Sequence, residues 1–171
     1  MNSQARCPLL RRLWMYFCFL ACFLAFHTQA KAQEKPPRPI EVRIDAAQQL
    51  NFGKFIPIGS GGTITVEHTT GSRSSFQGII PVGFISSPAR FIVDAEPGTV
   101  IRIVDIPDAT LNGSNGGYLN LHFGEWSIPS PFITTSQYTY ISIGGTLTVG
   151  SLMANPAGLY NGMFQVTFIQ E

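Results

Sequence analysis

The chain has 171 residues, of which eleven are basic and ten acidic, so its formal net charge is +1. A nearly balanced charge without a basic stripe argues against binding to nucleic acid or to an anionic membrane surface. The only cysteines, Cys7, Cys18 and Cys22, lie in the first 32 residues. If those residues are removed, the remaining chain has no thiol nucleophile, thiolate metal site or disulfide.

The first 32 residues have the three parts of a bacterial-type export signal. A basic region contains Arg6, Arg11 and Arg12, and the small residues Ala30 and Ala32 form a cleavage site. Between them, residues 13–26 form an apolar run of 14 residues, whereas a membrane-spanning helix needs about 20. We therefore predict cleavage between Ala32 and Gln33 and an exported protein of the periplasm, cell surface or extracellular space. Contact with the membrane is then expected only during export.

Two other interpretations of the N-terminus are weighed against this one. An uncleaved anchor would need a longer apolar run. A lipoprotein would be cut just before a cysteine, but Cys22 follows Phe19-Leu20-Ala21, where an aliphatic residue is wanted at the first position. Both alternatives are weaker than a cleaved signal.

The mature chain would have 139 residues, with seven basic and ten acidic side chains and a net charge of −3. This length suits one domain with a core that needs no disulfide. Residues 33–39 contain three prolines and mixed charges, which predict a semi-extended arm. The domain proper is expected at residues 40–171.

Short alternating apolar runs separated by glycine and proline predict β-strands throughout this domain. Ile40, Val42 and Ile44 alternate with charged residues and form the first strand candidate. A hairpin is expected next, with strands at 50–55 and 63–67 and a turn at Gly59-Ser60-Gly61-Gly62. Further strands are expected at 78–84, 89–94, 99–105, 118–123, 138–143, 145–149 and 162–170. No mature segment has apolar residues at helical spacing over three turns, so helix content should be close to nil.

Roughly eight to ten short strands without helices can bury their apolar faces as two packed sheets or as a closed barrel, and we favour the sandwich. In the last strand, Phe164, Val166 and Phe168 alternate with Gln165 and Thr167 and should face the core together. Replacing Phe164 by alanine should cost about 3–5 kcal/mol if its ring is fully buried.

Three sets of segments form a recognisable pattern: 145–149 with 155–168 near the C-terminus, 50–53 with 61–66 near the start of the domain, and 89–93 with 96–100 in its middle. Together they resemble the C-terminal signature, the opening motif and the middle strands of the bacterial family known as domain of unknown function 4402. The resemblance implies an exported protein with an immunoglobulin-like or pilin-like β-sandwich. The family brings no activity, cofactor or catalytic residue that could be transferred to this chain.

Tyr160 lies in Gly158-Leu-Tyr-Asn-Gly162, which resembles the tyrosine corner of sandwich domains. There a tyrosine hydroxyl bonds to backbone a few residues upstream and fixes the start of a late strand. The alternative is an ordinary half-buried aromatic residue.

No catalytic, cofactor or metal site is expected from the mature sequence. His68 and His122 lack a second ligand at a suitable spacing, and the serines of residues 60–75 lack a nucleophile elbow. Asp105, Asp108 and the polar run 112–116 gather oxygen ligands, but their spacing matches no known calcium loop.

Two functions of different class follow. The first is a non-catalytic structural or surface-assembly protein, a pilin-like subunit whose partners are identical or related β-sandwich subunits. Its candidate donor strand is Ile40, Val42 and Ile44, which could instead pair within its own domain. The second is a carbohydrate- or protein-binding module in which Trp126, Tyr138 or Tyr140 offers a stacking surface. For Trp126 the alternative is a core residue.

Overall fold

The computed structural model describes residues 36, 38–45 and 48–171 of the chain. The predicted signal (1–32) and most of the predicted arm (33–39) lie outside these residues. The described strands belong to one compact unit, Arg38–Glu171. They are β1 (Glu41–Ile44), β2 (Lys54–Val66), β3 (Arg73–Val82), β4 (Ala89–Asp94), β5 (Val100–Ile103), β6 (Ala109–Gly113), β7 (Tyr118–Trp126), β8 (Phe132–Ile133), β9 (Tyr138–Val149), β10 (Tyr160–Asn161) and β11 (Phe168–Gln170).

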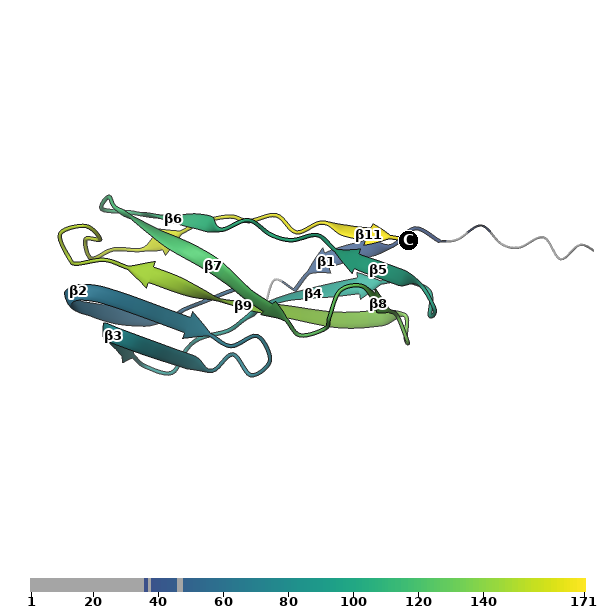
Figure 1. Cartoon of the computed structure of the whole chain (residues 1–171), viewed down its shortest axis with the longest axis horizontal. Helices are drawn as coiled ribbons and strands as arrows, with labels where there is room; N and C mark the ends of the chain where they lie inside the picture. Colours follow the sequence, from purple (N-terminus) through teal and green to yellow (C-terminus); the bar gives the residue numbers. More distant parts are fainter. Residues whose placement is uncertain (1–35, 37, 46–47) are drawn as a thin grey trace, which may run out of the picture. The chain divides into compact units, whose positions relative to one another are not determined.

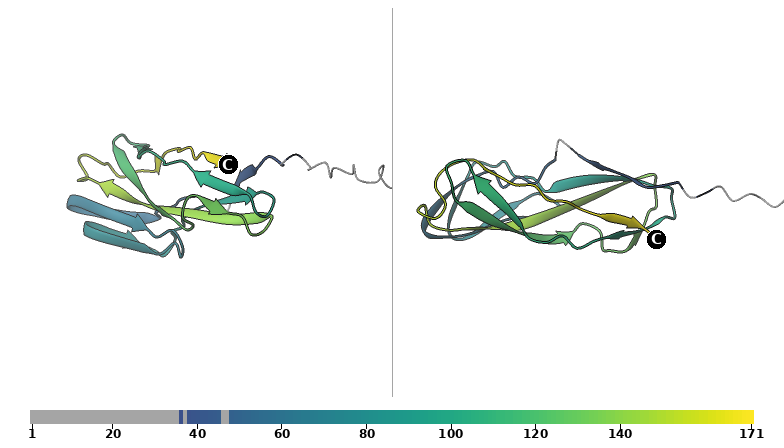
Figure 2. Two further views of the ribbon diagram at one scale, coloured as in Figure 1. Left: turned by 45° about the vertical axis from the view of Figure 1, so that its right-hand side comes forward. Right: turned by 90° about the horizontal axis from the view of Figure 1, so that it is seen from above.

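The unit is all-β and sandwich-like, as expected, and no helix occurs in the part of the chain that the structure describes. A larger sheet has the order β1-β4-β9-β7-β6-β10, with β2 joined to β9 and β3 joined to β2. A smaller sheet has the order β11-β5-β8. Figures 1 and 2 show β5 and β11 lying over β4 and β9.

Strand β9 organises the larger sheet, because three strands pair with it. On one edge it pairs with β7. On the other edge its first half pairs with β4 and its second half, from Gly145, pairs with β2. The two strands expected at 138–143 and 145–149 are thus one continuous strand. Gly144 is not a turn: it lies at the seam between β4 and β2, where a Cβ would collide with the carbonyl oxygen of Val66.

The hairpin expected around Gly59-Ser60-Gly61-Gly62 is wrong. Residues 54–66 form one strand, β2, and both of its halves pair with β3 across a register shift between Pro57 and Gly62. The turn of this hairpin is at residues 67–72. The glycines permit the irregularity, since Gly59 and Gly61 have positive φ, but the ladder to β3 continues past them.

The β2–β3 ribbon is folded back on itself at this irregularity. Arg73 stands opposite Val66 at one end of the ladder. Its guanidinium nevertheless donates to the carbonyl oxygens of Phe52 (2.8 Å), Lys54 (3.0 Å) and Gly83 (2.6 Å), which lie at the other end. The first half of β2 therefore leaves β9 and forms a separate wall at one end of the unit.

The core has two clusters. One lies between β5 and β8 on one side and β4 and β9 on the other, and includes Val93, Ile101 and Ile141. The second contains Phe91, Phe123 and Leu147. Phe164, Val166 and Phe168 are partly buried and pack against the second cluster, with Val166 and Phe168 also touching the first.

The last strand is shorter than expected, because no strand is formed at residues 162–167. Tyr160 pairs with Gly113 and Phe168 pairs with Ile103. Between these two pairs the C-terminal segment advances by eight residues, whereas the chain opposite it advances by ten. The unequal lengths break the ladder between β10 and β11, although the alternation of core-facing side chains continues across the break. Strands β6, β8 and β10 lie outside the expected strands, and β2 and β9 each replace two expected ones, so the described residues form eleven strands instead of eight to ten.

Candidate functional site

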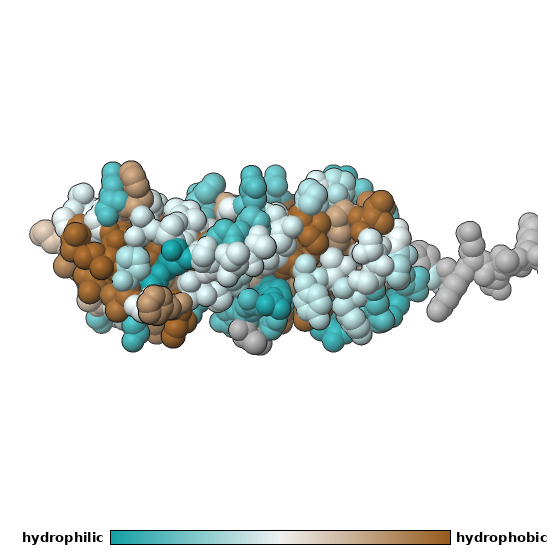
Figure 3. All heavy atoms as spheres, turned by 90° about the horizontal axis from the view of Figure 1, so that it is seen from below, coloured by the Kyte–Doolittle hydropathy of each residue, from teal (hydrophilic) through white to brown (hydrophobic). Residues whose placement is uncertain are grey.

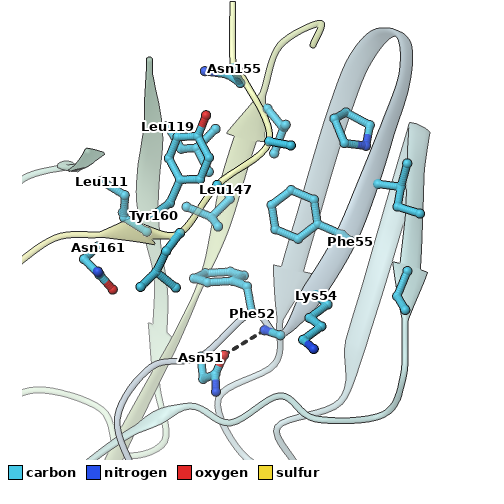
Figure 4. A pocket seen from close by; sticks show the side chains of 18 of the residues that line it. Asn51, Phe52, Lys54, Phe55, Leu111, Leu119, Leu147, Asn155, Tyr160 and Asn161 are labelled. Atoms are coloured by element: carbon cyan, nitrogen blue, oxygen red, sulfur yellow. Dashed lines mark hydrogen bonds between the residues drawn. The ribbon is translucent and has the colours of Figure 1, made fainter. Parts of the chain in front are cut away.

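The candidate site is a cleft of about 940 Å³ between the first half of β2 and β10, called the β2–β10 cleft below. Leu119 of β7 and Leu147 of β9 form its floor, and Phe52 and Phe55 line the β2 side. Figure 4 shows Phe55 and Tyr160 on opposite sides of Leu147. The cleft is therefore an apolar trough that the fold-back of the β2–β3 ribbon creates.

Each wall of the cleft is a strand segment that pairs with a neighbouring strand along one edge. No described strand pairs with its other edge. Residues 54–57 of β2 pair with β3, whereas the pairing of β2 with β9 covers only residues 62–66. On the opposite wall, β10 pairs with β6 and with no other described strand. Because backbone N–H and C=O groups are obligatory hydrogen-bonding groups, two such edges facing one trough can accept an extended peptide.

The lining is almost uncharged. Of the described residues that line the cleft, Lys54 alone carries a charge, and the polar ones are chiefly the amides of Gln49, Asn51, Asn155 and Asn161. Asn51 lies near Lys54 at the end of the cleft drawn lowest in Figure 4, where its side chain accepts a bond from the N–H of Gly53 (2.8 Å). This arrangement offers apolar burial and backbone pairing, and it brings together no pair of titratable groups.

Asn155 fixes the loop that forms the upper part of the cleft. It is 8% exposed. Its side-chain N–H donates to the carbonyl oxygen of Tyr118 (2.7 Å), and its Oδ1 accepts from the N–H of Gly150. Neither Asn155 nor Arg73 was singled out as a site residue from the sequence. In the sequence, an asparagine before a proline in a glycine-rich loop is typical of a turn, and a lone arginine is typical of an exposed surface position.

Tyr160 lies on the cleft wall and on the edge of the core. Its hydroxyl donates to the carbonyl oxygen of Pro156, four residues upstream, at 2.8 Å. This hydrogen bond has the form expected of a tyrosine corner. Its contribution to stability stays a prediction.

Phe164 and Phe168 join an aromatic cluster with Phe91, Phe123 and Trp126. Phe164 lies 4.7 Å from Phe123 and 6.4 Å from Phe91, between ring centroids. Phe168 lies 5.9 Å from Phe91 and 6.1 Å from Trp126. Side-chain packing therefore holds the C-terminal segment where its backbone ladder is broken.

Trp126, the candidate stacking residue, packs against Phe91 at 5.9 Å and Phe168 and is partly buried. Its ring is thus engaged in the core. Tyr138 and Tyr140 of β9 are 47% and 58% exposed and lie on one face of that strand. Of the three aromatic candidates, these two are open to solvent.

In the candidate donor strand, Val42 and Ile44 lie in β1, which pairs with β4 of the same chain, and Ile40 precedes β1 and packs, partly buried, against the first core cluster. All four side chains of β1 are exposed, Ile44 to 68%. Arg43 holds the strand through Asp94, which is 4% exposed and 3.3 Å away. The structure thus has the intramolecular pairing that the sequence left open.

A second apolar surface lies on the outward face of the β2–β3 ribbon. Ile56 and Ile80 stand opposite each other and are 51% and 48% exposed, and Phe76 is 68% exposed. Ile56 also borders the β2–β10 cleft, so the two surfaces meet at the first half of β2. Figure 3 shows apolar atoms gathered at the end of the unit where Figure 1 places β2 and β3. Gln77 has a left-handed φ of 59°, which marks a bend in β3, so its outer edge is not a straight one.

The turn at residues 67–72 is closed by the carboxylate of Glu67. It accepts from the N–H groups of Thr69 (2.8 Å) and Thr70 (2.5 Å) and from the Thr70 hydroxyl (2.8 Å). The hydrogen bonds from the Thr70 and Thr69 backbone lower the pKa of Glu67 from 4.5 to about 2. This carboxylate is an Asx-like turn element, and His68 beside it lies 3.3 Å from its Oε1.

The other polar candidates are not assembled into a site. His122 Nδ1 lies 2.8 Å from Asp108 Oδ1 on the surface. Over residues 36, 38–45 and 48–171, no group of three or more His, Cys, Asp or Glu side chains is close enough to hold a metal ion. Within those same residues, no helix is long and apolar enough to cross a membrane.

Comparison with known protein families gives a match over most of the chain. Residues 42–169 match the family described as "Domain of unknown function (DUF4402)". No match was found among the curated proteins or among the solved structures. The matched segment runs from β1 to β11 and includes both walls of the β2–β10 cleft. The chain belongs to the family of domain of unknown function 4402.

Proposed function

We propose that this protein is an exported, non-catalytic structural subunit of a bacterial surface assembly, pilin-like in type, that associates with identical or related subunits through strand pairing. The predicted signal at residues 1–32 supports export. The observation that carries the proposal is that β1 is a short, exposed edge strand. It is a four-residue edge strand, it pairs with β4 alone among the described strands, and its side chains are all exposed.

Energetics favour exchange of such a strand. Burial of apolar area stabilises a strand by about 25 cal/mol per Å². Val42 and Ile44 remain 37% and 68% exposed, so they realise only part of this gain in their own domain. Pairing with a neighbour could bury the remainder. Exposed edges with apolar side chains are the surfaces through which β-proteins associate.

The experiment measures the mass of purified mature protein against concentration, by size-exclusion chromatography with light scattering. We expect oligomers that grow with concentration. A variant lacking residues 33–45 should stay folded, by far-ultraviolet circular dichroism, and remain monomeric. A variant lacking only residues 33–37 is the matched control and should assemble. Mature protein that stays monomeric at every concentration, or a 33–45 deletion that unfolds, contradicts the proposal.

A binding module is the second candidate, and the exposure of Tyr138 and Tyr140 supports it. Two tyrosine rings on one strand face can stack on sugar rings. Glycan-array binding that is lost in Tyr140→Ala and retained in Trp126→Phe would favour this function over assembly.

A further inference from the structure

We infer that the β2–β10 cleft is the acceptor site for an extended strand from a second copy of this chain, and that the segment Ile40–Ile44 is the strand that enters it. The inference deepens the proposed function and rests on it for the source of the strand. It adds the place of binding and the residues that make it.

The backbone of the cleft walls leaves two strand edges open. The larger sheet curls so that residues 54–57 of β2 and residues 160–161 of β10 line one cleft, and neither edge has a strand partner on that side among the described residues. An entering strand can pair with one wall or with both. Pairing with both would close the sheet there and remove two open edges at once, which is how closed sheets avoid indiscriminate association.

Beneath the cleft, Leu119 and Leu147 are 1% and 2% exposed and Phe52 is 6% exposed, so the floor is apolar but already covered within one copy. Around the mouth, Leu152 and Leu159 are 54% and 67% exposed. An occupant with apolar residues at every second position would cover them. Without one, these leucines face solvent.

The residue pattern of the segment Ile40–Ile44 suits the cleft. In Ile40-Glu41-Val42-Arg43-Ile44 the three apolar residues share one face and the two charged residues share the other. With the apolar face on the floor, Glu41 and Arg43 point to solvent, as an almost uncharged lining requires. Five extended residues span about 17 Å, a length suited to the short strand edges that border the cleft.

A second copy must supply the strand, because within one copy β1 is engaged on β4. Arg43 and Arg38 approach the buried Asp94 carboxylate at 3.3 and 3.8 Å, and Glu41 to Ile44 continue the β4 ladder. Donation therefore opens these ion pairs in the donor copy. The outward face of the β2–β3 ribbon is the competing acceptor, and the bend at Gln77 disfavours a straight strand there.

The experiment uses a fluorescent peptide of residues 38–45 (RPIEVRID) and the mature protein, followed by fluorescence anisotropy. We expect saturable binding, and none for the peptide in which Ile40, Val42 and Ile44 are serine. Leu152→Arg and Leu159→Arg each place a charge at the cleft mouth and should weaken binding about tenfold or more. Met153→Arg is the matched control, because Met153 is 96% exposed, adjoins Leu152 and does not line the cleft.

Hydrogen exchange of the same samples gives a second readout, in which bound peptide should protect residues 54–56 and 159–161. Equal binding by Leu152→Arg, Leu159→Arg and Met153→Arg would overturn the inference, as would absence of peptide binding. Loss of binding in Phe76→Arg alone would move the acceptor to the β2–β3 ribbon. If the mature protein never assembles but the peptide binds in the cleft, the proposed function fails and the acceptor site stands. If the mature protein assembles, and Leu152→Arg and Leu159→Arg assemble equally well, the acceptor site fails and the proposed function stands.

Discussion

Replacing Phe164 by alanine tests how the C-terminal segment is held. No backbone ladder exists at residues 162–167, so the partly buried Phe164 ring and its neighbours must fix this segment. A fully buried phenylalanine would cost about 3–5 kcal/mol. Because the ring is only partly buried, we expect a lower transfer and cavity cost, to which the 4.7 Å contact with Phe123 adds about 0.5–1.5 kcal/mol.

The expected total is about 2–3 kcal/mol of unfolding free energy, or a fall in Tm of about 6–12 °C for a domain of this size. Urea denaturation followed by Trp126 fluorescence is the assay, since this residue belongs to the same aromatic cluster. Met163→Ala is the control, because Met163 is 96% exposed and should change stability by less than about 0.5 kcal/mol. Equal costs for the two variants would show that packing of the ring does not hold the segment.

Three further predictions follow from single contacts. Tyr160→Phe removes the hydroxyl that donates to the carbonyl oxygen of Pro156 and should cost about 1 kcal/mol in urea denaturation; an unchanged midpoint removes the tyrosine corner from the argument. The pKa of Glu67 is lowered to about 2 in the folded protein, so its stabilising effect is complete above pH 4.5 and is lost as the pH falls towards 2. Glu67→Gln should flatten the dependence of Tm on pH over that window, and parallel curves for the two proteins would refute the assignment. Gly144→Ala pushes a Cβ into the carbonyl oxygen of Val66 and should cost about 1–3 kcal/mol by calorimetry, whereas Gly124→Ala, whose Cβ would meet no atom closer than 3.9 Å, should cost less.

The sequence by itself determined the class of fold. Alternation of apolar side chains is a local property with a period of two, so it identifies strands wherever one face is buried. The segment 89–94 is the clearest case, since the predicted strand and β4 have the same bounds. The same alternation put Phe164, Val166 and Phe168 on one face, and the structure packs all three against the core.

Glycine was less informative, because several physical demands select it. The glycines at 59–62 predicted a hairpin turn and in fact permit a fold-back of the β2–β3 ribbon. Gly144 predicted a break between two strands, yet it allows Val66 to approach an unbroken β9. A sequence shows that a side chain is missing, but it does not show which distant atom needs the space.

The position of the candidate site depends on contacts between residues far apart in the chain. The β2–β10 cleft joins residues from 49 to 161, and its walls exist because Arg73 ties the two ends of the ribbon together. The choice of which edges pair and which stay open depends on contacts between residues far apart in the chain, where local periodicity carries no information. Strand alternation therefore defined the faces of this protein from its sequence, whereas long-range packing decided which of its edges remain open to a partner.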